Sequence, residues 1–377
     1  MKKYILSLIL ITILPGVCGL CSGATTPAFD QQTTRTLQDS LDTSVAAIGA
    51  PGATMTVIRP DGAKWVGVTG LADREKRTPM APGLKFRIGS VSKTFVATVI
   101  LKLVQEGSLS LDDTLESILP GLVANSSLIT VRQLLNHTSG LFDYAQAQKP
   151  FNFLAELYLQ PLKKWTPQEL VAVANANDPY FPPGTQFHYS NTNYVLLAMI
   201  IEKKTKRTYA QEISSRILVP LGLRNTSVPN TPDMPEGSTA GYTYDIDRQS
   251  ADKWVNTTRF DPSWAFGAGA AISNGEDLHI WLEALMKGSL LDERRRTDMF
   301  TFVSMGIPEC EYGLGLEKQR DAVGHTGDFV FGGQSALYQY RGWKFIVLVN
   351  ASPSSGVAAF GSEYIMALAI AALGLNQ

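Results

Sequence analysis

The spacing of apolar residues predicts a helix and a β-hairpin at the start of the folded chain. Within residues 36–48, apolar side chains recur at helical spacing, and Pro51 and Gly52 end that segment. Apolar and polar residues then alternate over 53–58 and 64–68. A Pro-Asp-Gly turn separates these two runs, as is typical of a hairpin.

The rest of the chain reads as a long helical middle followed by strands. A helix is expected at 90–106, and the pattern stays mostly helical to about residue 215, with segments at 131–135, 167–175 and 194–204. A further helix at 276–286 precedes strands at 335–340 and 345–349 and a last helix at 362–373. We therefore expect an α/β (α+β) fold, an antiparallel β-sheet flanked by helices, with an all-helical region inserted at about 105–265.

The N-terminus resembles a secretory signal peptide. Lys2 and Lys3 precede an apolar run over 4–17, and small residues including Ser22 and Ala24 follow. Cleavage after Ala24 leaves a mature domain of 25–377 and a secreted or periplasmic protein. A retained anchor is the alternative, but the run is shorter than the roughly 20 residues that a membrane span needs, so no stable membrane insertion is expected.

Charge and cysteine content narrow the chemistry. The chain has 33 lysine and arginine residues against 34 aspartate and glutamate residues, which gives no reason to expect a nucleic-acid partner. Two of its three cysteines lie in the signal segment, so Cys310 alone cannot form an internal disulfide or a cysteine-rich metal site. No zinc-binding His-Glu-x-x-His, phosphate-binding glycine loop or Gly-x-Ser-x-Gly occurs, so neither metal nor cofactor is expected.

Ser90 and Lys93 form the strongest candidate for catalysis. A serine at the first turn of a helix and a lysine three residues later share one face, and a desolvated lysine can take the serine proton. A capping serine with a solvated lysine is the simpler alternative. A second match, Ser250 and Lys253, lies in a polar stretch, whereas Ser90 opens the apolar helix that contains 95–104.

Two later motifs strengthen this interpretation. Tyr189-Ser190-Asn191 follows a Pro-Pro-Gly turn, where the phenol can shuttle protons and the asparagine amide can bind a substrate carbonyl. His325-Thr326-Gly327 begins a strand-like run, and its glycine lets a substrate approach the backbone. Taken singly, each motif is common. Their order and spacing together are not.

These motifs resemble the serine β-lactamase and D-alanyl-D-alanine carboxypeptidase superfamily. The resemblance extends over 86–93, 134–141, 189–191 and 324–327, and the tyrosine and histidine elements are nearest the class C branch, which includes related esterases. It implies a β-lactamase/transpeptidase-like fold from about residue 35 to the C-terminus. In this family the segment around His137 is a turn at a helix end, so we expect His137 to be structural.

The resemblance also implies roles for individual residues. Ser90 would be the acylated nucleophile, Lys93 its activating partner and Tyr189 the proton carrier. Asn191 would orient the substrate, and His325 would stand where class C enzymes have lysine, beside Thr326 and Gly327. The backbone N–H groups of Ser90 and Asp328 would form the oxyanion hole.

The protein is predicted to be an exported serine hydrolase of D-alanyl-D-alanine carboxypeptidase type that acts on a small-molecule or peptide substrate. A carboxypeptidase needs a cation for the terminal carboxylate, but Glu317 stands where some relatives have arginine, which leaves Lys318 or Arg320 as candidates. The alternatives are an esterase, a class C-like β-lactamase, or a penicillin-binding sensor with little turnover.

Overall fold

The computed structural model describes residues 28–244, 254–352 and 361–375. The predicted signal segment, with Cys18 and Cys21, lies outside the described residues, as does the second serine–lysine pair at 250–253. None of the helices in the described ranges combines the length and apolar character needed to cross a bilayer.

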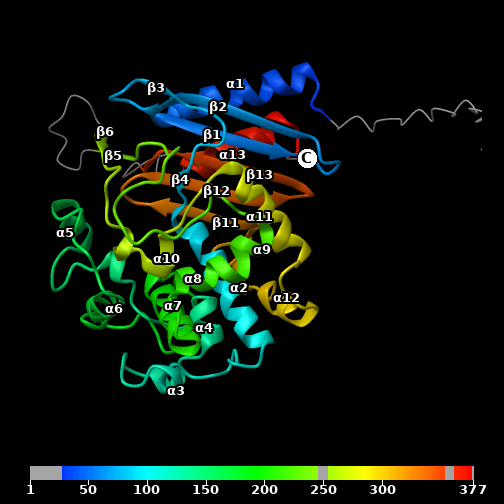
Figure 1. Cartoon of the computed structure of the whole chain (residues 1–377). Helices are drawn as coiled ribbons and strands as arrows, with labels where there is room; N and C mark the ends of the chain where they lie inside the picture. Colours follow the sequence, from blue (N-terminus) through cyan, green and yellow to red (C-terminus); the bar gives the residue numbers. More distant parts are fainter. Residues whose placement is uncertain (1–27, 245–253, 353–360, 376–377) are drawn as a thin grey trace, which may run out of the picture.

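The structure contains a nine-stranded sheet, and its strands β1–β3 and β11–β13 lie in the upper half of the molecule in Figure 1. Its strand order is β3-β2-β1-β13-β12-β11-β10-β9-β8, and every pairing is antiparallel. The first and last parts of the chain therefore meet at the β1–β13 pair, where Met55 lies opposite Val347. The strands are β1 (Gly52–Ile58), β2 (Lys64–Asp73), β3 (Thr78–Pro79), β8 (Val303–Ser304), β9 (Cys310–Tyr312), β10 (Glu317–Gln319), β11 (Ala322–Phe329), β12 (Gly333–Tyr340) and β13 (Trp343–Val349).

Helices cover both faces of this sheet. On one face α1 (Gln31–Ile48) and α13 (Gly361–Ala372) pack together over β2, β12 and β13, and α11 (Gly275–Lys287) packs on the other face (Figure 1). Every residue of β1 is buried, because each face of the strand meets a helix layer. The apolar stripe predicted in the first helix is confirmed, since Leu37, Leu41, Val45 and Ile48 are its buried apolar side chains.

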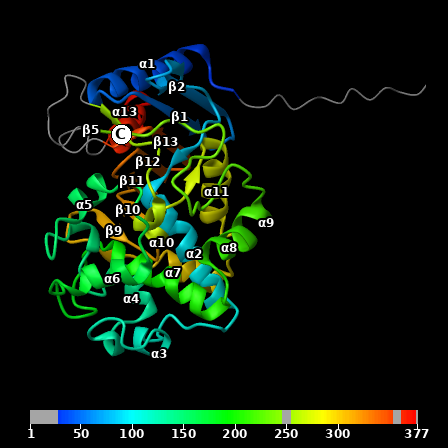
Figure 2. The ribbon, with the colours of Figure 1, turned by 60° about the vertical axis from the view of Figure 1, so that its left-hand side comes forward.

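The remaining helices gather below the sheet, as Figure 2 also shows. The link between the two halves is α2 (Ser92–Gln105), in which every residue except Lys102 and Gln105 is buried. It packs against α7 (Asn191–Thr205) and α10 (Phe266–Gly269). The other helices are α3 (Leu115–Ile118), α4 (Val131–Leu135), α5 (Phe153–Leu159), α6 (Pro167–Asn175), α8 (Tyr209–Ile213), α9 (Val219–Leu221) and α12 (Glu293–Met299).

Short strands complete the fold. A small sheet joins β5 (Tyr242–Tyr244) to β6 (Trp254–Asn256) and β14 (Ala351–Ser352). A two-stranded ribbon joins β4 (Phe86–Arg87) to β7 (Ile272–Ser273). The predicted fold class, an antiparallel sheet flanked by helices beside a helical region, is confirmed, whereas the boundaries at 25, 105 and 265 stay predictions.

Helix α1 begins five residues before its predicted start at residue 36. Two further differences at helix starts concern the site. Ser90 lies not in α2 but in η1 (Gly89–Val91), a 3₁₀ turn that leads into it. The helix predicted at 194–204 begins three residues earlier, so Asn191 is the first residue of α7. Apolar periodicity misses that start, because the first turn of α7 contains Asn191, Thr192 and Asn193.

Candidate active site

Ser90 and Lys93 meet where α2 begins under the sheet. The Lys93 side chain is completely buried, and its Nζ lies 2.9 Å from Ser90 Oγ. Nζ also donates to Asn191 Oδ1 at 2.9 Å and to the carbonyl of Ala268 at 2.7 Å. The ammonium group of Lys93 therefore has three acceptors for its three N–H bonds.

Burial changes the acid–base behaviour of Lys93. Loss of water around the charged form lowers the pKa of Lys93 to about 7, although the charges of Asp143 and Glu317 act in the opposite direction. When Nζ is neutral, it can keep two donated hydrogen bonds, to Asn191 and Ala268, and present its lone pair to the Ser90 hydroxyl. The lysine is thus poised to remove the serine proton near neutral pH.

Tyr189 lies against the same pair. Its ring centroid is 4.8 Å from Lys93 Nζ, and its phenol lies near enough to the Ser90 side chain to affect its own pKa. Burial, followed by the charge of Glu317, raises the pKa of Tyr189 well above its ordinary value, although the interaction with the Ser90 side chain acts the other way. The phenol is therefore protonated at neutral pH and can supply a proton to a leaving group.

Asp143 fixes the position of Asn191. This buried carboxylate is the N-cap of η3 (Tyr144–Gln146), and it accepts the Asn191 backbone N–H at 3.2 Å and its side-chain amide at 3.1 Å. The Asn191 side chain consequently turns its oxygen toward Lys93. Burial raises the pKa of Asp143, while its hydrogen bonds and Lys93 oppose the shift.

Two glycines bring the predicted oxyanion-hole segments together. Gly89 has φ +49°, and a Cβ there would lie within 2.7 Å of three backbone atoms of Asp328. A Cβ on Gly327 would lie 2.0 Å from the carbonyl oxygen of Ile88. Because neither residue has a side chain, η1 packs directly on β11, which places the backbone of Ser90 beside that of Asp328.

His325 is buried beneath this junction rather than open to the site. Its Nδ1 donates to the carbonyl of Thr326, and its Nε2 accepts from Tyr312 Oη at 2.8 Å. Burial lowers the pKa of His325, so the ring is neutral at pH 7. Substrate contact through a ring nitrogen would require one of these hydrogen bonds to break.

Glu317 holds Thr326 from behind. Its carboxylate is buried and accepts the Thr326 backbone N–H at 3.0 Å, the Thr326 hydroxyl and the Tyr338 hydroxyl. The His325 Nδ1 lies 3.6 Å from the other oxygen of Glu317. A negative charge therefore underlies the strand where a substrate carboxylate would need a positive one.

The two cations that the sequence offered for such a carboxylate are both engaged elsewhere. Lys318 pairs with Glu311, and Arg320 pairs with Glu309. Arg320 is also an exposed residue at the turn between β10 and β11. Neither side chain shares a hydrogen bond or ion pair with Ser90, Thr326 or Asn191 among the contacts of the described residues.

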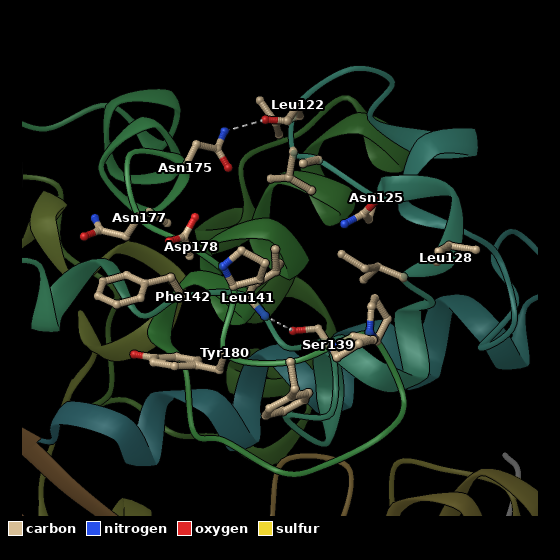
Figure 3. Close-up of a pocket in the computed structure, with 18 of the residues that line it drawn as sticks. Leu122, Asn125, Leu128, Ser139, Leu141, Phe142, Asn175, Asn177, Asp178 and Tyr180 are labelled. Carbon is tan, nitrogen blue, oxygen red and sulfur yellow. Dashed lines mark hydrogen bonds between the residues drawn. The ribbon is translucent and has the colours of Figure 1, made fainter.

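A separate cavity of about 910 Å³ lies in the helical region (Figure 3). Ser90 is not among its lining residues, but Phe142 and Tyr180 are. These two rings stack at 5.1 Å, and Tyr180 stacks on His188 at 3.6 Å, directly before Tyr189 in the chain. The cavity thus lies behind the segment that carries Tyr189.

The structure brings Ser90, Lys93, Tyr189 and Asn191 into one cluster, with Gly327 and Asp328 packed against η1 beside it. Sequence reasoning missed Asp143, whose signal was an acidic residue just after the 134–141 motif. It also missed Tyr312, the partner of His325, and the Ala268 carbonyl, which no side-chain pattern can reveal.

Comparison with known families agrees with this geometry. The family model described as Beta-lactamase matches residues 37–369. The chain belongs to the Beta-lactamase family. This family assignment covers the whole sheet and helical region described above, so the predicted superfamily is confirmed.

Several solved structures and curated proteins resemble this Beta-lactamase family member. A D-stereospecific amidohydrolase from Streptomyces sp. is 36% identical, with 84% of this chain and 94% of that chain covered and a TM-score of 0.74. The D-amino acid amidase from Ochrobactrum anthropi SV3, complexed with D-phenylalanine, is 28% identical, with 92% and 100% covered and a TM-score of 0.81.

Among curated sequences, penicillin-binding protein 4* from Bacillus subtilis (strain 168) is 29% identical over 279 residues, 68% of this chain and 58% of that protein. The chain spans about half the length of the curated relatives it matches. Like these relatives, the chain is an enzyme of the serine hydrolase superfamily, and it has the β-lactamase fold.

Proposed function

We propose that this protein is a serine amidohydrolase that forms an acyl-enzyme on Ser90 and prefers amides of D-amino acids or short D-peptides. The observation that carries the proposal is the hydrogen bond of Ser90 to a buried lysine whose pKa is lowered to about 7. A capping serine beside a solvated lysine would show neither property.

The residues define a sequence of proton transfers. Neutral Lys93 takes the Ser90 proton as Oγ attacks the amide carbon, and the N–H groups of Ser90 and Asp328 stabilise the oxyanion. The C–N bond then breaks as the leaving amine receives a proton through Tyr189. Water hydrolyses the resulting ester, with the same groups accepting its proton and returning Ser90 to the hydroxyl form.

Two observations favour an amide over a peptide with a free terminal carboxylate. Lys318 and Arg320 are paired with glutamates, and Glu317 puts a carboxylate behind Thr326. An amide terminus carries no charge, so it avoids this electrostatic cost. The similarity to a D-stereospecific amidohydrolase and a D-amino acid amidase supports the same substrate class and the D configuration.

The carboxypeptidase, β-lactamase and esterase activities then become side reactions of one site. An activated ester needs little protonation of its leaving group, so the Ser90–Lys93 pair suffices for it. A β-lactam and a D-alanyl-D-alanine peptide both present a carboxylate, which we expect to react poorly. A penicillin-binding sensor with little turnover would not need Tyr189 placed beside Ser90.

The test is a comparison of kcat/KM for D-phenylalanine amide, L-phenylalanine amide, a D-alanyl-D-alanine peptide, nitrocefin and a p-nitrophenyl ester. We expect the D-amide to exceed the L-amide and the carboxylate-bearing peptide by at least about tenfold, which is about 1.4 kcal/mol of transition-state discrimination. A higher value for the D-alanyl-D-alanine peptide than for the D-amide would restore the carboxypeptidase assignment.

We also propose that the enzyme is exported, on the basis of the basic, apolar and small-residue pattern of residues 2–24. Protein secreted by a bacterial host should begin within a residue or two of Thr25. N-terminal sequencing checks this, and secreted, folded protein that still begins at Met1 would contradict it.

A further inference from the structure

His137 occupies an unusual position at the end of α4. Its backbone has φ +60°, in the left-handed region, and its side chain is fully buried. The ring packs against three tyrosines, with centroid distances of 4.3 Å to Tyr189, 4.7 Å to Tyr312 and 5.3 Å to Tyr194. One of its neighbours is thus the proposed proton carrier itself.

The hydrogen bonds of His137 determine which of its two ring nitrogens carries the proton. Nδ1 lies 3.2 Å from the backbone nitrogen of Ser190 and 3.0 Å from Asn193 Nδ2. A backbone N–H can only donate, and Asn193 presents its NH₂ group because its oxygen accepts from Ser139 at 2.6 Å. Nδ1 must therefore be the unprotonated acceptor, and the neutral ring carries its proton on Nε2.

The opposite edge of the ring explains why the neutral form persists. Among the described residues, buried Nε2 has no hydrogen-bond partner, and the ring meets Tyr312 at 70°, edge to face. Burial, then the charge of Lys93 and the nearby His325 and His188, lowers the pKa of His137 well below its ordinary value. A protonated ring would also turn a second donor toward the Ser190 N–H.

Through these contacts, His137 holds the Tyr189–Asn191 segment in position. It tethers Ser190, the residue between the proposed proton carrier and the substrate-orienting amide, and its ring supports the Tyr189 ring from one side. Lys93 lies near Tyr189 as well, with Nζ 4.8 Å from the ring centroid. Within the described part of the chain, His137 forms no hydrogen bond with Ser90 or Lys93, so it acts through Tyr189.

We propose that His137 is a positioning residue that holds Tyr189 for proton delivery to the leaving group, an inference that rests on the acyl-enzyme mechanism proposed above. The consequence is specific. Substrates with a basic leaving group, such as amides and alkyl esters, depend on this proton, whereas a p-nitrophenyl ester does not. Damage at His137 should therefore fall on the first group and spare the second.

Two substitutions separate the roles of the His137 ring. His137→Asn keeps an acceptor close to the position of Nδ1, and asparagine tolerates the left-handed backbone. His137→Phe keeps an aromatic ring against Tyr189 but leaves the Ser190 N–H and the Asn193 amide without their acceptor. The matched control is His279→Phe, which changes a partly buried histidine of α11 outside the site.

The measurement is kcat/KM, which reports acylation, for an ethyl ester and a p-nitrophenyl ester of the same D-amino acid. The D-amide and the thermal midpoint of each variant are measured in parallel. For His137→Phe we expect a loss approaching about 10² with the ethyl ester and amide, the size of a general-acid contribution, and less than about fivefold with the p-nitrophenyl ester. On the ethyl ester and the amide, His137→Asn should be at least about tenfold more active than His137→Phe. The control His279→Phe should have wild-type activity.

The inference would be overturned if His137→Phe lost equal activity on both esters, or if it lost activity on neither. If His137→Phe does not fold, Asn193→Ser removes the second donor to Nδ1 and should give a smaller selective loss in the same direction. The ester pair needs only acylation of Ser90, so an inactive D-amide would count against the proposed substrate alone. Wild type that no fluorophosphonate labels at Ser90 would overturn both proposals.

Discussion

The site has a helical wall, formed by residues at the starts of α2 and α7, and a strand wall, formed by β10 and β11. Both walls contain buried polar residues, but they differ in whether those residues can change their protonation state. On the helical wall, Lys93 Nζ donates to the Ser90 hydroxyl and to Asn191 Oδ1, and Tyr189 lies against the lysine. Lys93 can exchange its protonation state near pH 7. On the strand wall, Glu317, His325 and Thr326 bond mainly to one another and to nearby tyrosines.

The difference separates chemistry from recognition. A buried polar group whose hydrogen bonds are all satisfied keeps one geometry and one charge. A group that can exchange a proton with its partner can take part in catalysis. The helical wall should therefore carry the proton transfers. The strand wall should present backbone and a fixed negative charge to the substrate.

The largest expected effect tests the helical wall directly. Ser90→Ala should abolish covalent labelling by a fluorophosphonate and reduce ester hydrolysis to background, because no other hydroxyl lies 2.9 Å from Lys93 Nζ among the described contacts. Peptide mapping by mass spectrometry checks the site of labelling in wild type. Label on Ser250, or full activity of Ser90→Ala, would reject the assignment.

Tyr189→Phe should produce the next largest loss. We expect at least about 10² in amide turnover, the usual scale of general acid–base catalysis, with acylation by a p-nitrophenyl ester much less affected. The proposed oxyanion hole consists of backbone N–H groups and should survive this change. Steady-state and burst kinetics separate the two steps, and a near-normal kcat on the amide would show that Lys93 alone handles the protons.

The pH profile compares the two walls. Because Lys93 must be neutral to act as a base, kcat/KM should rise tenfold per pH unit below about pH 7 and level off above it. Asp143 and Glu317 both raise the pKa of Lys93, with Asp143 the larger. Asp143→Asn should therefore move the rise to lower pH, and Glu317→Gln should move it less.

Stopped-flow acylation by an activated ester between pH 5 and 9 measures these midpoints. A midpoint that does not move in either variant would mean that neither carboxylate is charged while Lys93 titrates. A larger shift for Glu317→Gln than for Asp143→Asn would reverse the comparison and make the strand wall the main electrostatic partner of the lysine.

The sequence predicted the helical wall better than the strand wall, for a physical reason. Ser90 and Lys93 lie three residues apart in one turn, so local geometry alone brings them together. Tyr189 and Asn191 required the family resemblance, since nothing in their spacing places them near residue 90. Burial was not predictable, and it is burial that sets the Lys93 pKa and encloses His325.

Long-range hydrogen bonds account for the remainder. Asp143 reaches Asn191 across 48 residues, and the Ala268 carbonyl reaches Lys93 across 175. The start of α7 was placed too late because its first turn is polar, yet that polar turn is what carries Asn191 and Asn193 into the site. Residues that serve the site break the apolar pattern that predicts helices.

The smallest expected effect concerns the strand wall and the substrate carboxylate. Lys318→Ala and Arg320→Ala should each change kcat/KM for a D-alanyl-D-alanine peptide by less than about twofold, as expected for ion pairs that are partly or fully exposed. A direct charge-assisted contact to the carboxylate, worth about 1.5–3 kcal/mol, would instead cost roughly 10–150-fold on the peptide and spare a neutral ester. Such a selective loss would show that the ion pair with Glu311 or Glu309 opens for the substrate, and the strand wall would then contribute charge recognition as well as geometry.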